Sequence, residues 1–536
     1  MSYYLGFDLS TQQLKCTIID ETHEIVLEEA INFDRDLPEF NTKHGAVVND
    51  DVVTSPTLMW VKALDLLLEK LKSFPHISAI RGISGAGQQH GSVYWNQSGL
   101  EILKNLDPSK QLAEQLQLAF AIEQSPIWQD ASTTTECRAL EESVGGAEAL
   151  AKLTGSKAYE RFTGNQIAKI YHKNKESYDK TVCINLVSSF MATLLLGSIG
   201  PVDAAEGSGT NMMNIETHRW EKQLLEECGG SDLANKLHNE PVEGGTVLGK
   251  INKYYVKRYG FSADCSIMPF TGDNSATLAS MNLTQGDCVV SLGTSDTVLV
   301  YLKKDKAEPT TESHLMAHPT DIDGYMGMLC YKNGSLARQH IRDNYASRDW
   351  EIFNKYLVEK EAATEGYFGF YYWMQEIIPF AKGIYRFKNR QSIEDFQDPS
   401  VNVKAIVESQ FLSMKIRLER MGGNTKRILA SGGAAANGTI LQLLSDVFGL
   451  PVYRQKGMNG ASLGGALLAK FGTNKYKSFE EMMKEHSLND LELVYEFIEL
   501  ELGDRMATLT SVLNIRGCQY LVRLVAVLFA YDATTN

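Results

Sequence analysis

Two segments far apart in this chain share one order of local elements: an apolar strand, a turn of small hydroxyl residues and a second strand. They span residues 5–19 and 289–301, and Thr11 and Thr294 occupy matching places in their turns. Backbone N–H groups and hydroxyls in such turns can hold phosphate oxygens without a lysine. Two ordinary hairpins would explain either segment alone. Taken together, the segments predict two similar half-folds that face each other across a cleft.

An acidic turn lies just before the second of these segments. Residues 271–274, Thr-Gly-Asp-Asn, end an apolar run and precede a helix of small residues, 275–281. The glycine has no Cβ, so a ligand or another stretch of backbone can approach closely there. A carboxylate at Asp273, one helix away from the polar turn at Thr294, suits a site that handles phosphate. The alternative is that Asp273 only caps the helix that follows, since Asp is favoured at that position.

The rest of the chain alternates between apolar strands and amphipathic helices, which indicates an α/β protein with a mixed or parallel sheet. Residues 55–72 are typical of a helix, with Ser55 as the N-cap and a proline at the first helical position. A long helix is expected at 400–421, followed by a strand at 427–430. We expect the domains and tail to divide the chain as 1–280, 281–490 and 491–536.

Length and composition exclude several classes of partner. A chain of 536 residues is long enough for two or three domains. Its net charge of −14 argues against a nucleic acid or an anionic membrane as partner. The apolar run at 520–531 is shorter than the ~20 residues that span a bilayer. The eight cysteines are scattered without metal-ligand spacing, and no signal peptide is evident. These features favour reduced thiols in a cytoplasmic protein.

His314 and His318 are four residues apart, which is a spacing found in some zinc sites. The glutamate that follows the first histidine in such sites is missing here, and no strong helical pattern surrounds the pair. Packed or solvated histidines are therefore the preferred interpretation.

Five longer motifs carry a resemblance to a known family. They are SGAGQQHGS (84–92), YERFTGNQIAKIY (159–171), FTGDN (270–274), VSLGTSDT (290–297) and KNGSL (332–336). With the two matching segments and the Gly432-Gly433 pair after a strand, they resemble the FGGY carbohydrate kinases, and in detail the xylulokinase branch of that family. The similarity extends to about residue 475, and the sequence beyond about 490 departs from the family pattern.

The resemblance implies an α/β fold of two actin-like (ribonuclease H-like) domains, which face each other across a cleft for nucleotide and sugar. It implies ATP-dependent phosphorylation of D-xylulose to D-xylulose 5-phosphate, with Mg²⁺ as the metal. Such phosphoryl transfer depends mainly on positioning and charge neutralisation. The expected partners are a ketopentose and ATP, without nucleic acid or membrane. A monomer or a homodimer in the cytoplasm is expected.

On the sugar side, the resemblance makes Asp273 the general base that takes the proton from the attacking hydroxyl. Asn274 would orient a sugar hydroxyl, while His90, Gln89 and Arg161 would donate hydrogen bonds to the ketose oxygens. The alternatives are a core histidine at position 90 and an ion pair with a nearby acid at position 161.

On the nucleotide side, the resemblance implies two groups of contacts. The residues expected to border the adenine and ribose are Gly433, Ala434, Asn437 and Trp350. The residues expected to hold the phosphates and, through water, Mg²⁺ are Thr11, Thr294 and Asp8. Plain packing is the alternative for the tryptophan.

Two other functions are compatible with these motifs. One is a kinase of the same fold that acts on ribulose, L-xylulose or glycerol. The other is an actin-like nucleotide-binding protein without sugar turnover. The retained Asp273 argues against the second alternative, and the altered tail argues for it.

Overall fold

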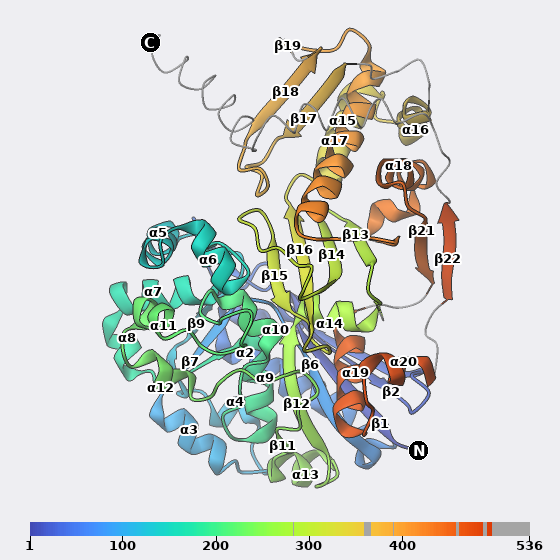
Figure 1. Cartoon of the computed structure of the whole chain (residues 1–536). Helices are drawn as coiled ribbons and strands as arrows, with labels where there is room; N and C mark the ends of the chain where they lie inside the picture. Colours follow the sequence, from blue (N-terminus) through green and yellow to red (C-terminus); the bar gives the residue numbers. More distant parts are fainter. Residues whose placement is uncertain (282, 359–365, 390, 457–459, 486–489, 496–536) are drawn as a thin grey trace.

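The computed structural model describes residues 1–281, 283–358, 366–389, 391–456, 460–485 and 490–495. The chain forms two lobes, each built around a mixed β-sheet with helices on its faces (Figure 1). The lower lobe in Figure 1 holds the first half of the chain, and the upper lobe holds most of the second. Residues 496–536, which make up nearly all of the predicted tail, lie outside the described residues.

The first sheet has the strand order β11-β12-β6-β1-β2-β3. Its strands are β1 (Tyr3–Leu9), β2 (Gln13–Ile19), β3 (Ile25–Asn32), β6 (Ile80–Gly87), β11 (Gly249–Lys250) and β12 (Ser266–Gly272). β1 pairs antiparallel with β2 and parallel with β6, and β6 pairs parallel with β12. Because side chains alternate along a strand, Leu5 and Tyr4 belong to the separate cores on the two faces of this sheet.

The second sheet has the strand order β15-β16-β14-β13-β20-β21-β22. Its strands are β13 (Asp287–Leu292), β14 (Asp296–Lys303), β15 (His314–Ala317), β16 (Gly324–Tyr331), β20 (Arg427–Ser431), β21 (Val452–Lys456) and β22 (Asp490–Tyr495). β13 pairs antiparallel with β14 and parallel with β20, and β20 pairs parallel with β21. This repeats the pairing of β1 with β2 and β6, and of β6 with β12. The prediction of two similar half-folds is confirmed.

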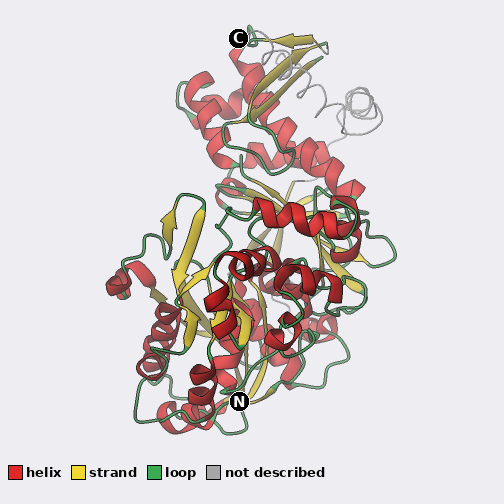
Figure 2. Cartoon of the chain, turned by 90° about the vertical axis from the view of Figure 1, so that its left-hand side faces the viewer, coloured by secondary structure: helices red, strands yellow, loops and turns green. Residues whose placement is uncertain are grey.

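Smaller sheets carry the remaining described strands, and one of them lies at the far end of the second lobe (Figure 2). These strands are β4 (Val47–Asn49), β5 (Val52–Pro56), β7 (Ser92–Trp95), β8 (Phe120–Ile122), β9 (Gln124–Pro126), β10 (Cys183–Leu186), β17 (Tyr367–Tyr372), β18 (Gly383–Lys388) and β19 (Gln391–Ile393).

The helices cover the sheets and fill the space between the smaller elements (Figures 1 and 2). The α-helices of the first half are α1 (Phe33–Asp36), α2 (Thr57–Leu71), α3 (Gln97–Lys104), α4 (Leu112–Gln115), α5 (Thr134–Ser143), α6 (Ala147–Thr154), α7 (Thr163–Lys173), α8 (Lys175–Lys180), α9 (Val187–Leu196), α10 (Ala204–Gly207), α11 (Lys222–Gly229), α12 (Leu233–Leu237), α13 (Lys253–Tyr259) and α14 (Asp273–Ser280). Those of the second half are α15 (Ser335–Tyr345), α16 (Trp350–Val358), α17 (Pro399–Arg420), α18 (Gly438–Phe448), α19 (Ala461–Thr473) and α20 (Phe479–Glu485). The 3₁₀ helices are η1 (Pro38–Phe40), η2 (Ile77–Ala79), η3 (Ser208–Thr210) and η4 (Gly433–Ala436).

Most of the expected elements are present, with one shifted boundary. The helix and strand expected at 400–421 and 427–430 are confirmed as α17 and β20. Ser55 is not the N-cap of α2, because it pairs with Ser125 in the β5–β9 ladder and its hydroxyl donates to the carbonyl oxygen of Gly45. In the described part of the chain, no helix combines the length and the apolar character that crossing a membrane requires.

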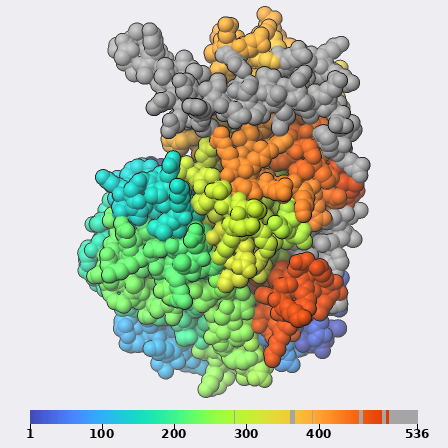
Figure 3. All heavy atoms as spheres, in the orientation of Figure 1, coloured from blue at the N-terminus to red at the C-terminus, as the bar shows by residue number. Residues whose placement is uncertain are grey.

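Helix α19 returns from the second half of the chain to the first sheet, where it packs on β1, β6 and α14. In Figure 3 it lies with α20 against the lower lobe. The approach is close because the facing residues are small. A Cβ on Gly465 would lie 2.5 Å from the Cα of Gly85, and a Cβ on Gly464 would overlap the carbonyl oxygen of Ala276. The division at residue 280 stays a prediction, and α19 lies on the first lobe although that division assigns it to the second.

The close packing of α19 on α14 predicts that Gly464→Ala destabilises the protein. Alanine gains about 1 kcal/mol of helix propensity over glycine, but overpacking against backbone typically costs ~1–3 kcal/mol and here involves an overlap with a carbonyl oxygen. We expect a net loss of at least about 1 kcal/mol, seen as a lower midpoint of thermal or urea unfolding.

Gly460→Ser is the matched control for this substitution. Gly460 occupies the N-cap of the same helix, a Cβ there meets no atom within 4 Å, and serine is favoured at N-caps. Its midpoint should equal that of the unaltered protein. Equal midpoints for both variants would contradict the packing argument.

Candidate active site

The carboxyl ends of three parallel strands meet at one edge of the first sheet. In the pairing register, Leu9 of β1 and Gly272 of β12 both stand opposite Gly87 of β6. Asp8 on β1, the turn that follows Gly87, and Asp273 directly after β12 therefore lie at the same edge. Ligands of α/β proteins bind in the crevice outside such strand ends. This edge is the candidate active site.

Asp273 is the first residue of α14, and its carboxyl group bonds to the start of that helix. The N-cap position belongs to Gly272, so Asp273 is not the N-cap residue and lies at the first helical position. Oδ1 of Asp273 accepts the backbone N–H of Asn274 at 2.9 Å. Burial raises the pKa of the Asp273 carboxyl to about 6, although nearby backbone N–H groups favour the charged form. Such a group is ionised at neutral pH and still basic enough to accept a proton.

Asp8 is a second buried carboxyl group at this edge. Burial, followed by the charge of Asp273, raises the pKa of Asp8 to about 7, and Lys15 opposes this rise. Oδ1 of Asp8 is buried without a hydrogen-bond partner, which is costly unless a bound water or cation offsets it. Within the described ranges, no cluster of three or more His, Cys, Asp or Glu side chains is arranged to hold a metal. Asp8 therefore fits the role of holding a hydrated Mg²⁺ ion through a water molecule better than the role of a direct metal ligand.

Two further acids, which sequence reasoning missed, lie beside this edge. Asp203 accepts a hydrogen bond from the hydroxyl of Thr271 on β12 at 2.6 Å, and burial raises the pKa of Asp203 to about 7. Among the residues that the structure describes, neither carboxyl oxygen of Glu206 has a hydrogen-bond partner, and a Cβ on Gly272 would overlap Oε2 of Glu206. Burial, followed by the charges of Asp273 and Asp203, raises the pKa of Glu206 well above its ordinary value. The available signal was a pair of acids in a run of small residues, 203–209.

Two amide side chains named in the sequence analysis lie next to Asp273. Nδ2 of Asn274 donates to Oε1 of Gln89 at 3.0 Å, and Nε2 of Gln89 lies 3.7 Å from the sulfur of Met316. The preceding residue, Gln88, has both amide atoms buried without a partner. The structure thus brings these amides together at the strand ends, where they offer neutral donors and acceptors.

His90 follows them in the same turn and has an unusual backbone. Its φ is 71°, a left-handed conformation that is uncommon for residues other than glycine and is often retained at functional sites. Burial, followed by the charge of Arg161, lowers the pKa of His90 to about 3, so the ring is neutral. Nδ1 lies 2.8 Å from the carbonyl oxygen of Gly209, to which only a protonated nitrogen can donate. Nε2 therefore carries the lone pair, and an acceptor role replaces the donor role expected for this histidine.

Arg161 packs against aromatic rings rather than against an acid. Its guanidinium lies 4.9 Å from the ring centre of Tyr159 and 5.5 Å from that of Phe162. Nη2 of Arg161 donates to Nε2 of His314 at 2.9 Å. Across the residues that the structure describes, Arg161 has no ion pair, so the alternative of a surface or hinge ion pair does not apply. His314 belongs to the second sheet, and no local sequence pattern predicted its contact with Arg161.

The two polar turns occupy equivalent places in the two lobes. Thr11 lies between β1 and β2, and its hydroxyl accepts the indole N–H of Trp128 at 2.8 Å. Thr294 lies between β13 and β14, and the carbonyl oxygen of the preceding Gly293 accepts the N–H of Ser335 at 2.9 Å. The role of these turns in phosphate binding stays a prediction.

The residues expected at the base lie together on the second lobe. Gly433 and Ala434 form the start of η4, and Asn437 is the N-cap of α18. Nδ2 of Asn437 donates to Oδ1 of Asn354 on α16 at 2.8 Å, which joins this turn to the helix that Trp350 begins. The indole is 38% exposed and has Arg342 over its ring at 4.7 Å. The ring centre of Phe353 lies 5.0 Å from that of Trp350, so the indole packs against its neighbours, and its place at the adenine stays a prediction.

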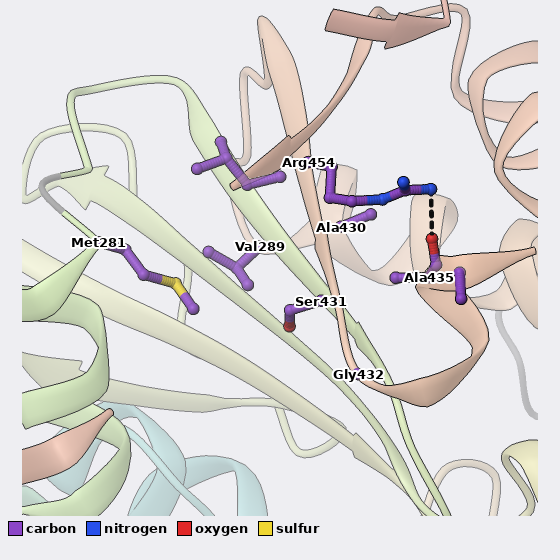
Figure 4. Close-up of a pocket in the computed structure, with 9 residues that line it drawn as sticks. Met281, Val289, Ala430, Ser431, Gly432, Ala435 and Arg454 are labelled. Carbon is purple, nitrogen blue, oxygen red and sulfur yellow. Dashed lines mark hydrogen bonds between the residues drawn. The ribbon is translucent and has the colours of Figure 1, made fainter. Parts of the chain in front are cut away.

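A pocket of about 330 Å³ adjoins this turn (Figure 4). Its lining includes Ser431, Gly432, Ala435 and Arg454, together with residues of β13 and of the segment after α14. Nη2 of Arg454 donates to the carbonyl oxygen of Ala435 at 2.8 Å, as the dashed line in Figure 4 marks. The pocket lies beside the turn expected to border the adenine, although none of the four residues expected there is part of its described lining.

Two family models match most of the chain. The N-terminal domain of the FGGY family of carbohydrate kinases matches residues 117–280, and its C-terminal domain matches residues 288–472. A xylulose kinase of Rattus norvegicus is 47% identical over 475 residues, which cover 87% of this chain and 88% of that protein. Xylulose kinase 2 of Arabidopsis thaliana is 43% identical over 500 residues, with 89% of each chain covered.

Solved structures share the fold at much lower sequence identity. The xylulose kinase from Rhodospirillum rubrum matches with a TM-score of 0.77 at 16% identity, over 95% of this chain and 99% of that chain. Glycerol kinase from Plasmodium falciparum, solved with ADP, matches with a TM-score of 0.75 at 16% identity, over 96% of this chain and 98% of that chain. These matches confirm the expected fold of two facing α/β domains. With the family models and the relatives above 40% identity, they show that the chain belongs to the FGGY family of carbohydrate kinases.

Proposed function

We propose that this chain transfers the γ-phosphoryl group of Mg-ATP to D-xylulose and produces D-xylulose 5-phosphate. The observation that carries the proposal is the half-buried carboxylate of Asp273, placed with Asp8 at the carboxyl edge of the first sheet. Identities of 43–47% to proteins named xylulose kinases support the choice of sugar.

Asp273 would act as the general base. The attacking hydroxyl oxygen bonds to the γ-phosphorus while the bond from that phosphorus to the β,γ-bridging oxygen breaks and ADP leaves, and the carboxylate accepts the hydroxyl proton. Burial gives Asp273 a pKa of about 6, so the base form dominates at neutral pH. Burial, followed by the charges of Asp273 and Asp203, raises the pKa of the neighbouring Glu206 well above its ordinary value, which favours the uncharged form of that acid. General-base catalysis of this kind is typically worth ~10²–10⁴-fold.

The neighbouring side chains would bind and orient the ketose. The guanidinium of Arg161 can only donate hydrogen bonds, which suits carbonyl or hydroxyl oxygens. Nε2 of His90 would accept from a sugar hydroxyl, because its Nδ1 donates to the backbone. The amides of Asn274 and Gln89 are bonded to each other and can exchange that bond for hydroxyls of the substrate.

The nucleotide would bind between the two polar turns and the second lobe. Bound Mg²⁺ neutralises charge on the phosphates during transfer, and Asp8 would hold its water shell through the unpartnered Oδ1. The phosphates would lie at Thr11 and Thr294. The residues proposed to border the adenine and ribose are Gly433, Ala434, Asn437 and Trp350. In this arrangement residues 1–280 form the sugar domain and 281–490 the nucleotide domain.

A cytoplasmic location is part of the proposal. The seven cysteines that the structure describes are free, and six of them are buried. Persistent free thiols are the usual state in a reducing compartment.

The test of the proposal is ADP formation by the purified chain with Mg-ATP and a panel of acceptors. The panel comprises D-xylulose, L-xylulose, D-ribulose, glycerol and no sugar. ADP release is expected to be strong with D-xylulose and near background with the others. Release with another alcohol instead would overturn the substrate assignment. A folded sample without sugar-dependent release would favour a nucleotide-binding protein without turnover.

Asp273→Asn is expected to lower kcat by at least ~10²-fold, because the amide keeps the shape of the carboxylate but cannot accept the proton. The KM for the ketose should change much less. Asp264→Asn is the control, since Asp264 is an exposed residue just before the same strand. Turnover near that of the control would remove Asp273 as the base.

The activity is expected to fall in acid. The pKa of about 6 that burial gives Asp273 means that the carboxylate is protonated, and unable to accept a proton, below that pH. Log kcat/KM for the ketose should therefore be level near pH 8 and fall with a slope of about one below pH 6. Initial rates between pH 5 and 8.5 at subsaturating ketose measure this profile. A flat profile down to pH 5 would be inconsistent with the assignment.

A further inference from the structure

Strand β15 is the edge strand of the second sheet, and it also contacts the first lobe (Figure 1). The N–H of Leu315 donates to the carbonyl oxygen of Gly155 at 2.8 Å, and the N–H of Ala317 donates to the hydroxyl of Ser208 at 2.9 Å. Gly155 permits this approach, because its φ is 86° and a Cβ there would overlap the carbonyl oxygen of Leu315. The strand is thus bonded to both lobes at the level of the candidate site.

His314, at the start of this strand, is 1% exposed and has both ring nitrogens engaged by residues of the first lobe. Nη2 of Arg161 lies 2.9 Å from Nε2, and the hydroxyl of Ser156 lies 3.1 Å from Nδ1. Arginine has donors only, so Nε2 must be the acceptor and Nδ1 must carry the proton that points to Ser156. Burial, followed by the charge of Arg161, holds the pKa of His314 well below its ordinary value, which agrees with this neutral tautomer.

The imidazole also belongs to the ring cluster beneath the sugar side of the site. Its ring centre lies 4.6 Å from that of Tyr159 and 5.5 Å from that of Phe162. Phe162 in turn stacks on His90 at 4.4 Å with an angle of 19° between the ring planes. The guanidinium of Arg161 lies over Tyr159 and is held at its end by His314. One layer of side chains therefore fixes both the arginine and the histidine proposed to bind the ketose.

We propose that His314 is a positioning residue for the ketose: from the second lobe, its Nε2 holds the guanidinium of Arg161 in the orientation that receives the sugar. The inference rests on the proposed role of Arg161 in sugar binding. Since the acceptor and the arginine belong to different lobes, the sugar side of the site is complete only when β15 lies against the first lobe. Removing the acceptor frees one N–H of the half-buried Arg161 guanidinium and weakens ketose binding while the nucleotide residues stay in place.

Two substitutions separate the hydrogen bond from the packing. His314→Phe keeps a flat ring against Tyr159 and removes the acceptor, and His314→Gln places an amide oxygen near the position of Nε2. We expect His314→Phe to raise the KM for D-xylulose roughly tenfold, which corresponds to the loss of one hydrogen bond made by a half-buried charged donor. The KM for ATP should stay within about twofold, and His314→Gln should recover most of the loss. Steady-state ADP release with either substrate varied measures both values.

Matched controls and a second variant make the outcome decisive. His318→Phe alters a buried histidine of the same segment whose Nδ1 bonds to Thr320, and it should leave the KM for D-xylulose unchanged. Arg161→Gln should raise that KM, and adding His314→Phe to it should have little further effect, because the two residues act as a unit.

If His314→Phe does not fold, Ser156→Ala replaces it. This variant removes the partner of Nδ1 and should raise the KM for D-xylulose alone.

Three results would overturn the inference. An unchanged KM for D-xylulose in His314→Phe, while Arg161→Gln raises it, would remove His314 and keep the proposed sugar role of Arg161. Equal losses in His314→Phe and His314→Gln would show that only packing matters. An unchanged KM in Arg161→Gln would reject the sugar role of that arginine, and the inference would fall with it. If Ser156→Ala is the variant used, an unchanged KM overturns the inference in the same way.

Discussion

The parallel register of β1, β6 and β12 is the constraint on which the site depends. It sets Leu9 and Gly272 opposite the same residue, so the chain leaves three strands at one edge. A slip of β1 by one residue would turn every side chain of that strand to the other face of the sheet. Asp8 would then point into the apolar core on the opposite face. The small residues at this edge follow from the same geometry, since α19 and the start of α9 approach the strands closely.

The same edge concentrates negative charge in a buried environment. Two unit charges 4 Å apart repel by about 4 kcal/mol at an effective dielectric constant of 20, so neighbouring acids there ionise one after another rather than together. Burial raises the pKa of Asp273 least, to about 6, and raises that of Asp8 to about 7. Asp273, the carboxylate proposed as the base, thus has the smaller rise in pKa of these two acids. Burial and the charges of Asp273 and Asp203 also raise the pKa of Glu206 well above its ordinary value.

Local patterns were sufficient for the architecture and for part of the site. The matching turns at Thr11 and Thr294 predicted the repeated half-folds, because turn chemistry and strand alternation are properties of neighbouring residues. The motif around Asp273 was identifiable for the same reason. Contacts made across long sequence separations were not predictable. His314 was interpreted as packed or solvated, since nothing in its neighbours shows that Arg161 lies beside it. The acceptor role of His90 likewise depends on the carbonyl oxygen of Gly209, which only the fold brings close.

Helix α19 gives the molecule a particular order of assembly. It covers a face of the first sheet that includes Tyr4, Ile19 and Met268, although it is among the last described elements of the chain. During synthesis that face of the sheet stays exposed until residue 473, the end of α19, has left the ribosome. Contacts between residues so far apart in the sequence are also slow to form. The first lobe is thus an unfinished domain for most of translation. A chain that ends before residue 461 would expose this apolar surface to solvent. Both halves of the chain must therefore be synthesised before this surface is protected from aggregation.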